Sequence, residues 1–177
     1  HGYVFATLPA SEGMEEVPAG VCLGCPELSE VILHDGVKRI HSNAFEGCMS
    51  LTDIVLPSAL EYIGSYAFTN SGIKGKEVQI NDKTVCALQI PETVKIIEYH
   101  AFAQCDSLKA VQMLSREPFE VYEAFSPSTM IYVPEGCYDA YKSAWKGIYN
   151  WAEKKVSVIG DFNGWNSFYS GDIKELP

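Results

Sequence analysis

The dipeptide Ala-Phe recurs along this 177-residue chain at a spacing that constrains the fold more than any other feature. It occurs at 44–45, 67–68, 101–102 and 124–125. Successive phenylalanines are 23, 34 and 23 residues apart, and the middle interval is one period of 23 plus an insertion of 11. A repeat of this length predicts a solenoid, because one unit cannot bury its apolar face alone whereas stacked units bury a continuous core.

The apolar pattern that follows Ala-Phe is also repeated. Leu51, Ile54 and Leu56 give Leu-x-x-Ile-x-Leu, after which come Pro57 and a second apolar pair. This alternation predicts a short strand that buries one face, with Pro ending the ladder. We expect the phenylalanines to stack from coil to coil. The matching positions are Leu28, Val31, Leu33, Val37 and Ile40 in the preceding unit, Val85, Leu88, Ile90, Val94 and Ile97 in the following unit, and Leu108, Val111 and Met113 in the next.

The string over residues 44–57, Ala-Phe-Glu-Gly-Cys-Met-Ser-Leu-Thr-Asp-Ile-Val-Leu-Pro, continues to Tyr62-Ile63-Gly64 and resembles the BspA-type leucine-rich repeat. The resemblance covers about residues 18–151. It includes a terminal signature made of Ile131-Tyr132-Val133-Pro134 followed by Tyr138, Tyr141 and Trp145. It implies an α/β leucine-rich-repeat solenoid that is β-rich, with short parallel strands stacked at a 23-residue period and a C-terminal capping helix. It also implies a secreted or surface-anchored bacterial protein that adheres to host or neighbouring-cell proteins.

We divide this single domain into three parts: an N-terminal extension or cap (1–17), the solenoid (18–133), and a capping helix with a tail (134–177). Apolar residues at steps of three and four predict one face of the helix: Tyr138, Tyr141, Trp145, Ile148 and Ala152. The tail segment Ile159–Trp165 resembles the Gly-x-Phe-Asn-x-Trp opening of glycogen-binding-type carbohydrate modules. Too few residues follow it for a β-sandwich. We therefore expect a turn-rich segment packed on the cap, the alternative being the start of another domain.

The 11-residue insertion predicts a hairpin near residues 74–87. Val78 and Ile80 alternate with polar residues, Asn81-Asp82 is typical of a turn, and Val85 restarts the apolar run. Insertions held by a rigid scaffold often carry function. The alternative is that the hairpin is functionally neutral.

Cys22-x-x-Cys25 is the one feature that looks like a chemical site. A structural zinc ion needs four ligands, and no second Cys pair is present. A redox-active Cys-x-x-Cys motif would lie at the start of a helix that follows a strand, whereas this pair lies inside a repeat. Aligning the units places Cys22 in the phenylalanine column and puts five small residues in another column: Cys25, Cys48, Ser71, Cys105 and Ser128. We expect free, buried thiols; a disulfide and a metal site are the alternatives.

The net charge and the absence of catalytic motifs limit the classes of function that the chain can have. The chain has 13 basic and 23 acidic residues, a net charge of −10, which argues against nucleic-acid binding and against docking on anionic membranes. No apolar run approaches the length of a membrane span. The sequence starts at His1 without a leader, so we take any signal peptide to be absent from it. No combination of nucleophile, base and orienting group can be assembled. We therefore expect no catalytic residue, no metal and no cofactor.

The strand face is the candidate binding site. The residue between the last two apolar positions of each strand should point away from the core, and these residues form a column: Ile32, Val55, Gln89, Gln112 and Tyr132. A second outward column consists of Glu30, Asp53, Ala87, Ala110 and Met130. Exposed apolar residues at both ends suggest contact with a partner. The alternative is that the tail or the hairpin covers this face.

These features together predict a non-catalytic, surface-exposed interaction module. We expect it to bind an extracellular protein or glycan through the strand face, and to be a monomer. The alternative is a structural spacer segment of a longer surface protein with no ligand of its own.

Overall fold

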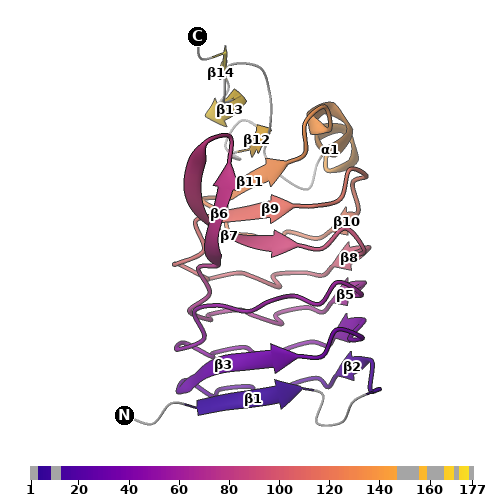
Figure 1. Ribbon diagram of the computed structural model, residues 1–177, viewed down its shortest axis with the longest axis vertical. Coiled ribbons are helices and arrows are strands. Elements are labelled where there is room, and N and C mark those ends of the chain that lie inside the picture. The colour runs from indigo at the N-terminus through magenta and orange to yellow at the C-terminus, as the bar shows by residue number, and fades with distance from the viewer. Residues whose placement is uncertain (1–3, 9–12, 147–155, 159–165, 170–171, 176–177) are drawn as a thin grey trace.

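The computed structural model describes residues 4–8, 13–146, 156–158, 166–169 and 172–175, with side chains described for 13–146. The chain winds into a β-solenoid of about five turns with one short helix near the C-terminal end (Figure 1). The turns form two strand layers, called here the front sheet and the rear sheet. The predicted leucine-rich-repeat solenoid is therefore confirmed.

The rear sheet comes from the second apolar pair of each unit. Its five parallel strands lie in the order β10-β8-β5-β4-β2, and every strand has two residues. They are β2 (Glu16–Val17), β4 (Arg39–Ile40), β5 (Tyr62–Ile63), β8 (Ile96–Ile97) and β10 (Glu120–Val121). Their second residues, such as Ile40 and Ile63, are fully buried, which is why this pair recurs in every unit.

The front sheet is divided, whereas the rear sheet is continuous. β1 (Val4–Leu8) pairs in parallel with β3 (Leu28–Leu33), and these two strands form a separate sheet. The second part contains β7 (Lys83–Ile90), β9 (Ala110–Met113) and β11 (Met130–Val133), also in parallel. Between the two parts lies the segment 51–57, which is not a strand although its sequence predicts one. That prediction is wrong, because the segment has no ladder partner.

The insertion changes the course of the third coil beside this segment. The amide of Lys74 donates to the Thr52 carbonyl at 2.9 Å, so the third coil begins beside the second. The chain then leaves at Gly75, whose φ is +81° and where a Cβ atom would collide with the Ala87 backbone. Ile73 is fully buried in the main core, whereas Val85 lies in the hairpin and is half-buried. The alignment of Val85 with Leu51 is therefore wrong, and Ile73 takes that core position.

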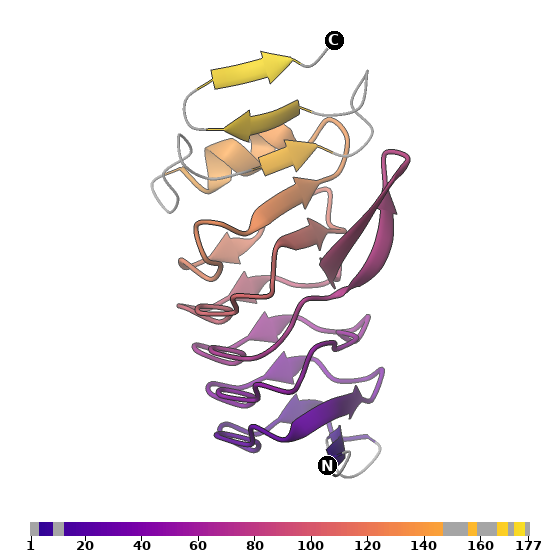
Figure 2. The same ribbon diagram turned by 90° about the vertical axis from the view of Figure 1, so that its left-hand side faces the viewer.

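The inserted residues form an antiparallel hairpin between β6 (Lys76–Ile80) and the first part of β7. Figure 2 shows it rising beside the front sheet toward the C-terminal end. Its Ile80 is fully buried and forms a second cluster with Ala87, Ala110 and Tyr132. Burial of a side chain of this size contributes about 2 kcal/mol. The hairpin thus covers the outer side of the upper front sheet.

The Ala-Phe turns stack as the sequence predicts. Phe45, Phe68, Phe102 and Phe125 form a continuous ladder with ring centroids 5.2, 5.0 and 5.3 Å apart. The residue before each Ala-Phe has a left-handed backbone, with φ between 47° and 60°, in all four units: Asn43, Tyr66, His100 and Glu123. The same conformation in every unit keeps the turns in register, so the rings meet.

The C-terminal end is closed by α1 (Tyr138–Ala144), as predicted. Tyr141 is fully buried and its hydroxyl donates to the Ser115 carbonyl at 2.9 Å. The indole of Trp145 donates to the Phe119 carbonyl at 2.7 Å. The helix ends at Ala144, and the predicted face residues Ile148 and Ala152 lie outside the described residues.

Both terminal segments contribute strands. β1 and β2 add a coil below β3 and β4, within the segment expected to be an extension or cap. Beyond the helix, β12 (Val156–Val158) pairs in parallel with β11, and β13 (Asn166–Tyr169) and β14 (Asp172–Glu175) continue antiparallel. These strands flank the segment 159–165, for which a turn-rich structure stays a prediction. The Ile159–Trp165 motif lies outside the described residues.

All six cysteines are free. Cys48, Ser71 and Cys105 are buried small residues of one column, and the Ser71 hydroxyl lies 3.4 Å from the Cys105 thiol. Burial raises the pKa of the Cys48 thiol to about 12. Cys25 and Ser128 are exposed, which corrects their assignment to the buried column. For Cys25 the reason is its place in the first Ala-Phe-type turn, where no earlier turn of this kind covers it.

Candidate binding face

The predicted column of outward residues divides into three parts. Ile32 and Val55 are exposed, at 46% and 63% of their surface. Gln89 and Gln112 lie beside each other on β7 and β9, and the Gln89 amide nitrogen donates to the Gln112 amide oxygen at 2.9 Å. Tyr132 is buried, at 6% exposure, in the cluster around Ile80. Tyr132 is therefore not a free binding residue, because the inserted hairpin packs over it.

The second outward column is divided in the same way. Glu30, Asp53 and Met130 are half-buried, whereas Ala87 and Ala110 are buried against Ile80. The alternative in which the hairpin covers the strand face is thus correct for its upper part. The lower part, with Ile32 and Val55, remains open.

A groove lies at the division of the front sheet and is called here the front groove. Its volume is about 330 Å³, at the lower end of the range for ligand pockets. The second coil contributes Asp53, Ile54, Val55, Leu56 and Ser58; the hairpin contributes Lys76 and Val78; β7 and the residues near it contribute Ala87, Leu88, Gln89, Pro91, Glu92 and Leu114. The lining is mostly apolar, with charged groups at the rim.

The charged rim of the front groove is partly neutralised. The Lys76 ammonium lies 3.4 Å from the Asp53 carboxylate, so the hairpin is tied to the second coil by this ion pair. Glu92 has no ion pair among the described residues. The front groove therefore keeps one uncompensated carboxylate beside its apolar floor.

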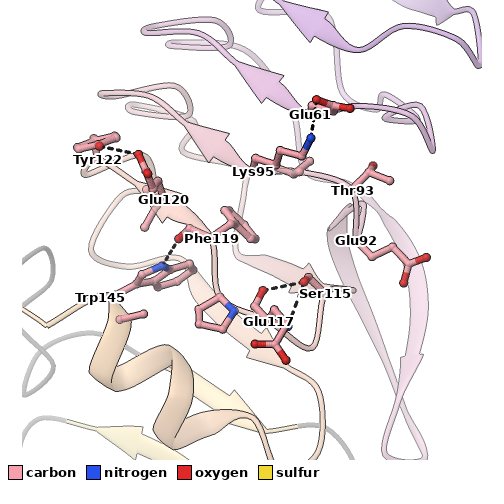
Figure 3. A pocket seen from close by; sticks show the side chains of 14 residues that line it. Glu61, Glu92, Thr93, Lys95, Ser115, Glu117, Phe119, Glu120, Tyr122 and Trp145 are labelled. Carbon is pink, nitrogen blue, oxygen red and sulfur yellow. Dashed lines mark hydrogen bonds and ion pairs between the residues drawn. The ribbon is translucent and has the colours of Figure 1, made fainter.

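A second hollow, of about 740 Å³, lies between the end of the rear sheet and α1 (Figure 3). Its lining includes Glu61, Glu92, Glu117 and Glu120, together with Phe119, Tyr122 and Trp145. The Tyr122 hydroxyl donates to Glu120 at 2.8 Å, and this bond raises the tyrosine pKa. The only lysine in the lining is Lys95, which is ion-paired with Glu61 at 2.8 Å. This acidic pocket repels anions.

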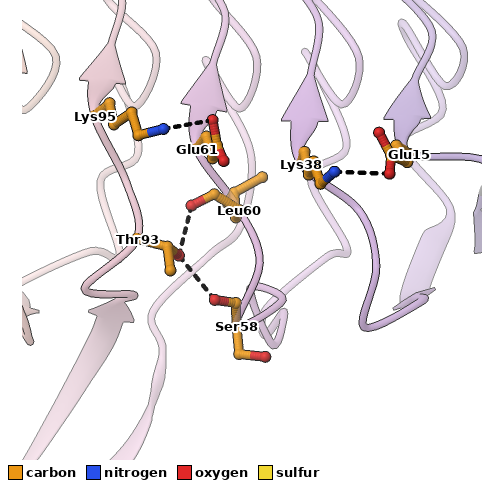
Figure 4. Close-up of polar contacts among 7 residues, drawn as sticks. All are labelled: Glu15, Lys38, Ser58, Leu60, Glu61, Thr93 and Lys95. Carbon is orange, nitrogen blue, oxygen red and sulfur yellow. Dashed lines mark hydrogen bonds and ion pairs between the residues drawn. The ribbon is translucent and has the colours of Figure 1, made fainter.

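Stacking of the coils brings charged residues of separate repeat units together. Glu15, Lys38, Glu61 and Lys95 form a column of alternating charge along the rear sheet. The Lys38 and Lys95 ammonium groups lie 2.7 and 2.8 Å from Glu15 and Glu61 (Figure 4). Lys95 lowers the pKa of Glu61 through this hydrogen bond. The spacings of 23, 23 and 34 residues in the sequence would have revealed this column.

Two further searches concern only the part of the chain that the structure describes. No three His, Cys, Asp or Glu side chains gather there closely enough to hold a metal ion. No helix there has the length and apolar character to cross a membrane.

The sequence matches the profile of the BspA-type leucine-rich repeat region over residues 15–87 and 81–175. The chain belongs to this family. The family is one of repeat modules, which agrees with the stacked coils. A comparison with curated protein sequences gave no match.

Two solved structures are similar to this BspA-type chain. One is a leucine-rich repeat protein from Bacteroides ovatus, with 21% identity and a TM-score of 0.44 over 73% of this chain. The other is a leucine-rich cell surface protein from Faecalibacterium prausnitzii, with 26% identity and a TM-score of 0.40 over 73% of this chain. The chain spans 39% and 41% of the length of these two proteins.

Proposed function

We propose that this repeat module is exposed at the bacterial cell surface or secreted, and that it binds an extracellular protein or glycan as a monomer. The observation that carries the proposal is the exposure of Val55, 63%, at the centre of the one part of the front face that the hairpin leaves open. A large apolar side chain beside a mostly apolar groove favours contact with a partner. Ile32 extends this apolar surface onto β3.

The proposed binding site contains fewer residues than the predicted column of outward strand residues. It comprises Ile32, Val55 and Gln89, with Gln112 beside Gln89. Tyr132 is left out because it is buried. The family resemblance and this open face support an adhesive role.

The proposal is tested by screening the purified domain against extracellular-matrix proteins and a glycan array. Val55→Asp adds a charge to the face. Met49→Asp is the matched control, because Met49 is 58% exposed on the same coil but does not line the front groove. We expect Val55→Asp to abolish binding and Met49→Asp to leave it unchanged, with both variants folded by circular dichroism.

Two results would count against the proposal. Equal binding by both variants would exclude the front face as the site. Binding to none of the proteins or glycans would favour the alternative, a spacer segment of a longer surface protein.

A further inference from the structure

The acidic pocket between the rear sheet and α1 differs from the front groove in its charge and in the aromatic rings that line it. We propose that this pocket receives a lysine or arginine side chain of a protein partner. The inference rests on the proposed function, because it names a protein as the partner and adds a second contact beside the front groove. Carboxylates and aromatic rings both bind such cations favourably.

The pocket is negatively charged because its carboxylates outnumber its one lysine. Glu61 is neutralised by Lys95, whose ammonium lies 2.8 Å from it. Glu92 and Glu117 are exposed and have no ion pair within the part of the chain that the structure describes. Glu120 accepts a hydrogen bond from a tyrosine hydroxyl at 2.8 Å, which does not neutralise its charge. Among the described residues, three carboxylates therefore line one hollow without a compensating cation.

The column of alternating charge on the rear sheet compensates the carboxylates of the preceding coils. Its last member is Lys95, and Figure 3 shows the ammonium of this residue directed toward Glu61 rather than toward Phe119. Phe119 takes the next place in the column, because the ladder pairs Glu120 with Ile96. At this place the next coil therefore supplies an aromatic ring to the pocket instead of a charged side chain.

The aromatic wall of the pocket is held in place by contacts within the fold. The half-buried Phe119 ring makes T-shaped contacts with Tyr141 and Trp145, at centroid distances of 6.5 and 5.8 Å. The Trp145 indole donates to the Phe119 carbonyl at 2.7 Å. The Ser115 hydroxyl donates to the Glu117 carbonyl at 2.7 Å and fixes the turn that precedes the ring. A wall that is already ordered loses little conformational entropy when a cation binds against it.

Glu92 joins the acidic pocket to the front groove, because its side chain lines both hollows. It lies between β7 of the front sheet and β8 of the rear sheet. A protein bound at this edge can place an apolar side chain against Val55 and a basic side chain beside Glu92. An anionic glycan would be repelled, and a neutral glycan would leave the carboxylates uncompensated. Charge complementarity therefore favours a protein with a basic side chain.

The pocket is tested first with a single basic side chain. The probe is N-acetyl-arginine methylamide, and its matched control is the citrulline analogue, which has nearly the same shape without the charge. In the full chain, we expect the arginine probe at millimolar concentration to shift the NMR signals of the Trp145 indole and of the amides of residues 119–122. No shift, or the same shift with the citrulline analogue, would overturn the proposal.

Variants matched in charge locate the bound cation. Glu117→Gln and Glu120→Gln each remove one carboxylate of the pocket, whereas Glu27→Gln removes an exposed carboxylate that lines neither hollow. At low salt we expect each pocket variant to weaken binding of the arginine probe by about two- to fivefold, and Glu27→Gln to leave it unchanged. Phe119→Leu, which keeps an apolar side chain without the ring, should weaken it by a similar factor of about two to five. Equal losses in all variants, Glu27→Gln included, would overturn the site, because they would reflect the net charge alone.

A displayed library of random peptides tests whether the partner is a protein. We expect the peptides enriched on the wild type to combine apolar residues with lysine or arginine. They should bind the double variant Glu92→Gln/Glu117→Gln about fivefold more weakly or worse at low salt, and Glu27→Gln as well as the wild type. Failure to enrich any peptide, or enrichment of peptides without basic residues, would overturn the inference.

The outcomes separate this inference from the proposed function. If the pocket variants bind every partner as the wild type does while Val55→Asp abolishes binding, the inference fails and the proposed function stands. If basic peptides depend on the pocket carboxylates and no partner depends on Val55, the proposed function fails and the pocket remains a site for a basic side chain.

Discussion

The rings of Phe68 and Phe102 stack with their centroids 5.0 Å apart and their planes inclined by 5°, although 34 residues separate them. The neighbouring pair Phe45 and Phe68, separated by 23 residues, has nearly the same spacing, 5.2 Å. The insertion therefore leaves the Ala-Phe side of the solenoid undisturbed. All its consequences fall on the front sheet, where the hairpin departs.

Replacing Phe68 with alanine should destabilise the protein strongly. Phe68 is fully buried between two other rings, so the change removes both its transfer free energy and its contacts on two coils. We expect a loss of about 3–5 kcal/mol in the free energy of unfolding, measured in urea. Tyr122→Ala, at an exposed aromatic residue, is the control and should change it by about 0.5 kcal/mol or less. A similar loss in both variants would contradict the ladder as the core of the fold.

The six cysteine thiols should react at different rates according to their solvent exposure. Cys25 and Cys86 are exposed, and the other four are buried. Thiolates are the reactive form, and burial raises the pKa of Cys48 to about 12 and also raises the pKa of Cys105. We expect two thiols to react rapidly in the native protein at pH 8, and all six after unfolding without a reductant. A count below six in the unfolded protein would reveal a disulfide.

Removing the Tyr141 hydroxyl should change stability and its pH dependence. In Tyr141→Phe the Ser115 carbonyl loses a buried donor, which should cost about 1 kcal/mol at neutral pH. Burial raises the Tyr141 pKa above its ordinary value of 10.0. Above that pH the unfolded chain releases the proton while the folded chain retains it, so folding stability falls as pH rises.

Chemical denaturation at a series of pH values from about 8 to about 11 measures this effect. The phenylalanine variant should lose less stability than the wild type over this range, because it lacks one of the titrating groups. Parallel curves for the two proteins would show that Tyr141 does not contribute to the alkaline loss.

Reversing one charge of the rear-sheet column should lower the melting temperature in a salt-dependent way. Lys95→Glu places a second carboxylate beside Glu61, in place of an ion pair at 2.8 Å. Lys95→Gln, which removes the attraction without adding repulsion, should have the smaller effect. In about 1 M NaCl, where the screening length is about 3 Å, the difference between the two variants should nearly disappear. A difference independent of salt would point to packing of the lysine stem instead.

Several features could be predicted because they depend on residues at a fixed period. The phenylalanine ladder, the buried second pair and the strand Met130–Val133 follow from local alternation repeated along the chain. Tyr141 and Trp145 at helical spacing predicted the capping helix. In each case the local pattern and the stacking of neighbouring units favour the same structure.

The binding face could be predicted only in part. Alternation correctly placed Ile32 and Val55 outward, but it also assigned Tyr132 to the surface. Period-two alternation says which side of a sheet a residue faces, not what covers that side. The burial of Tyr132 depends on Ile80, which reaches it from a hairpin more than two periods earlier in the chain.

The sequence by itself determined the solenoid, its period and its family, because each unit repeats the apolar residues that stacking must bury. Only the tertiary structure decided where the front sheet is interrupted. The residues of Leu51–Leu56 read as a strand like any other, yet a strand exists only if a neighbour supplies hydrogen bonds. In the folded chain this segment pairs with neither β3 nor β7, the chain leaves the third coil at Gly75, and Val55 lies beside an open groove.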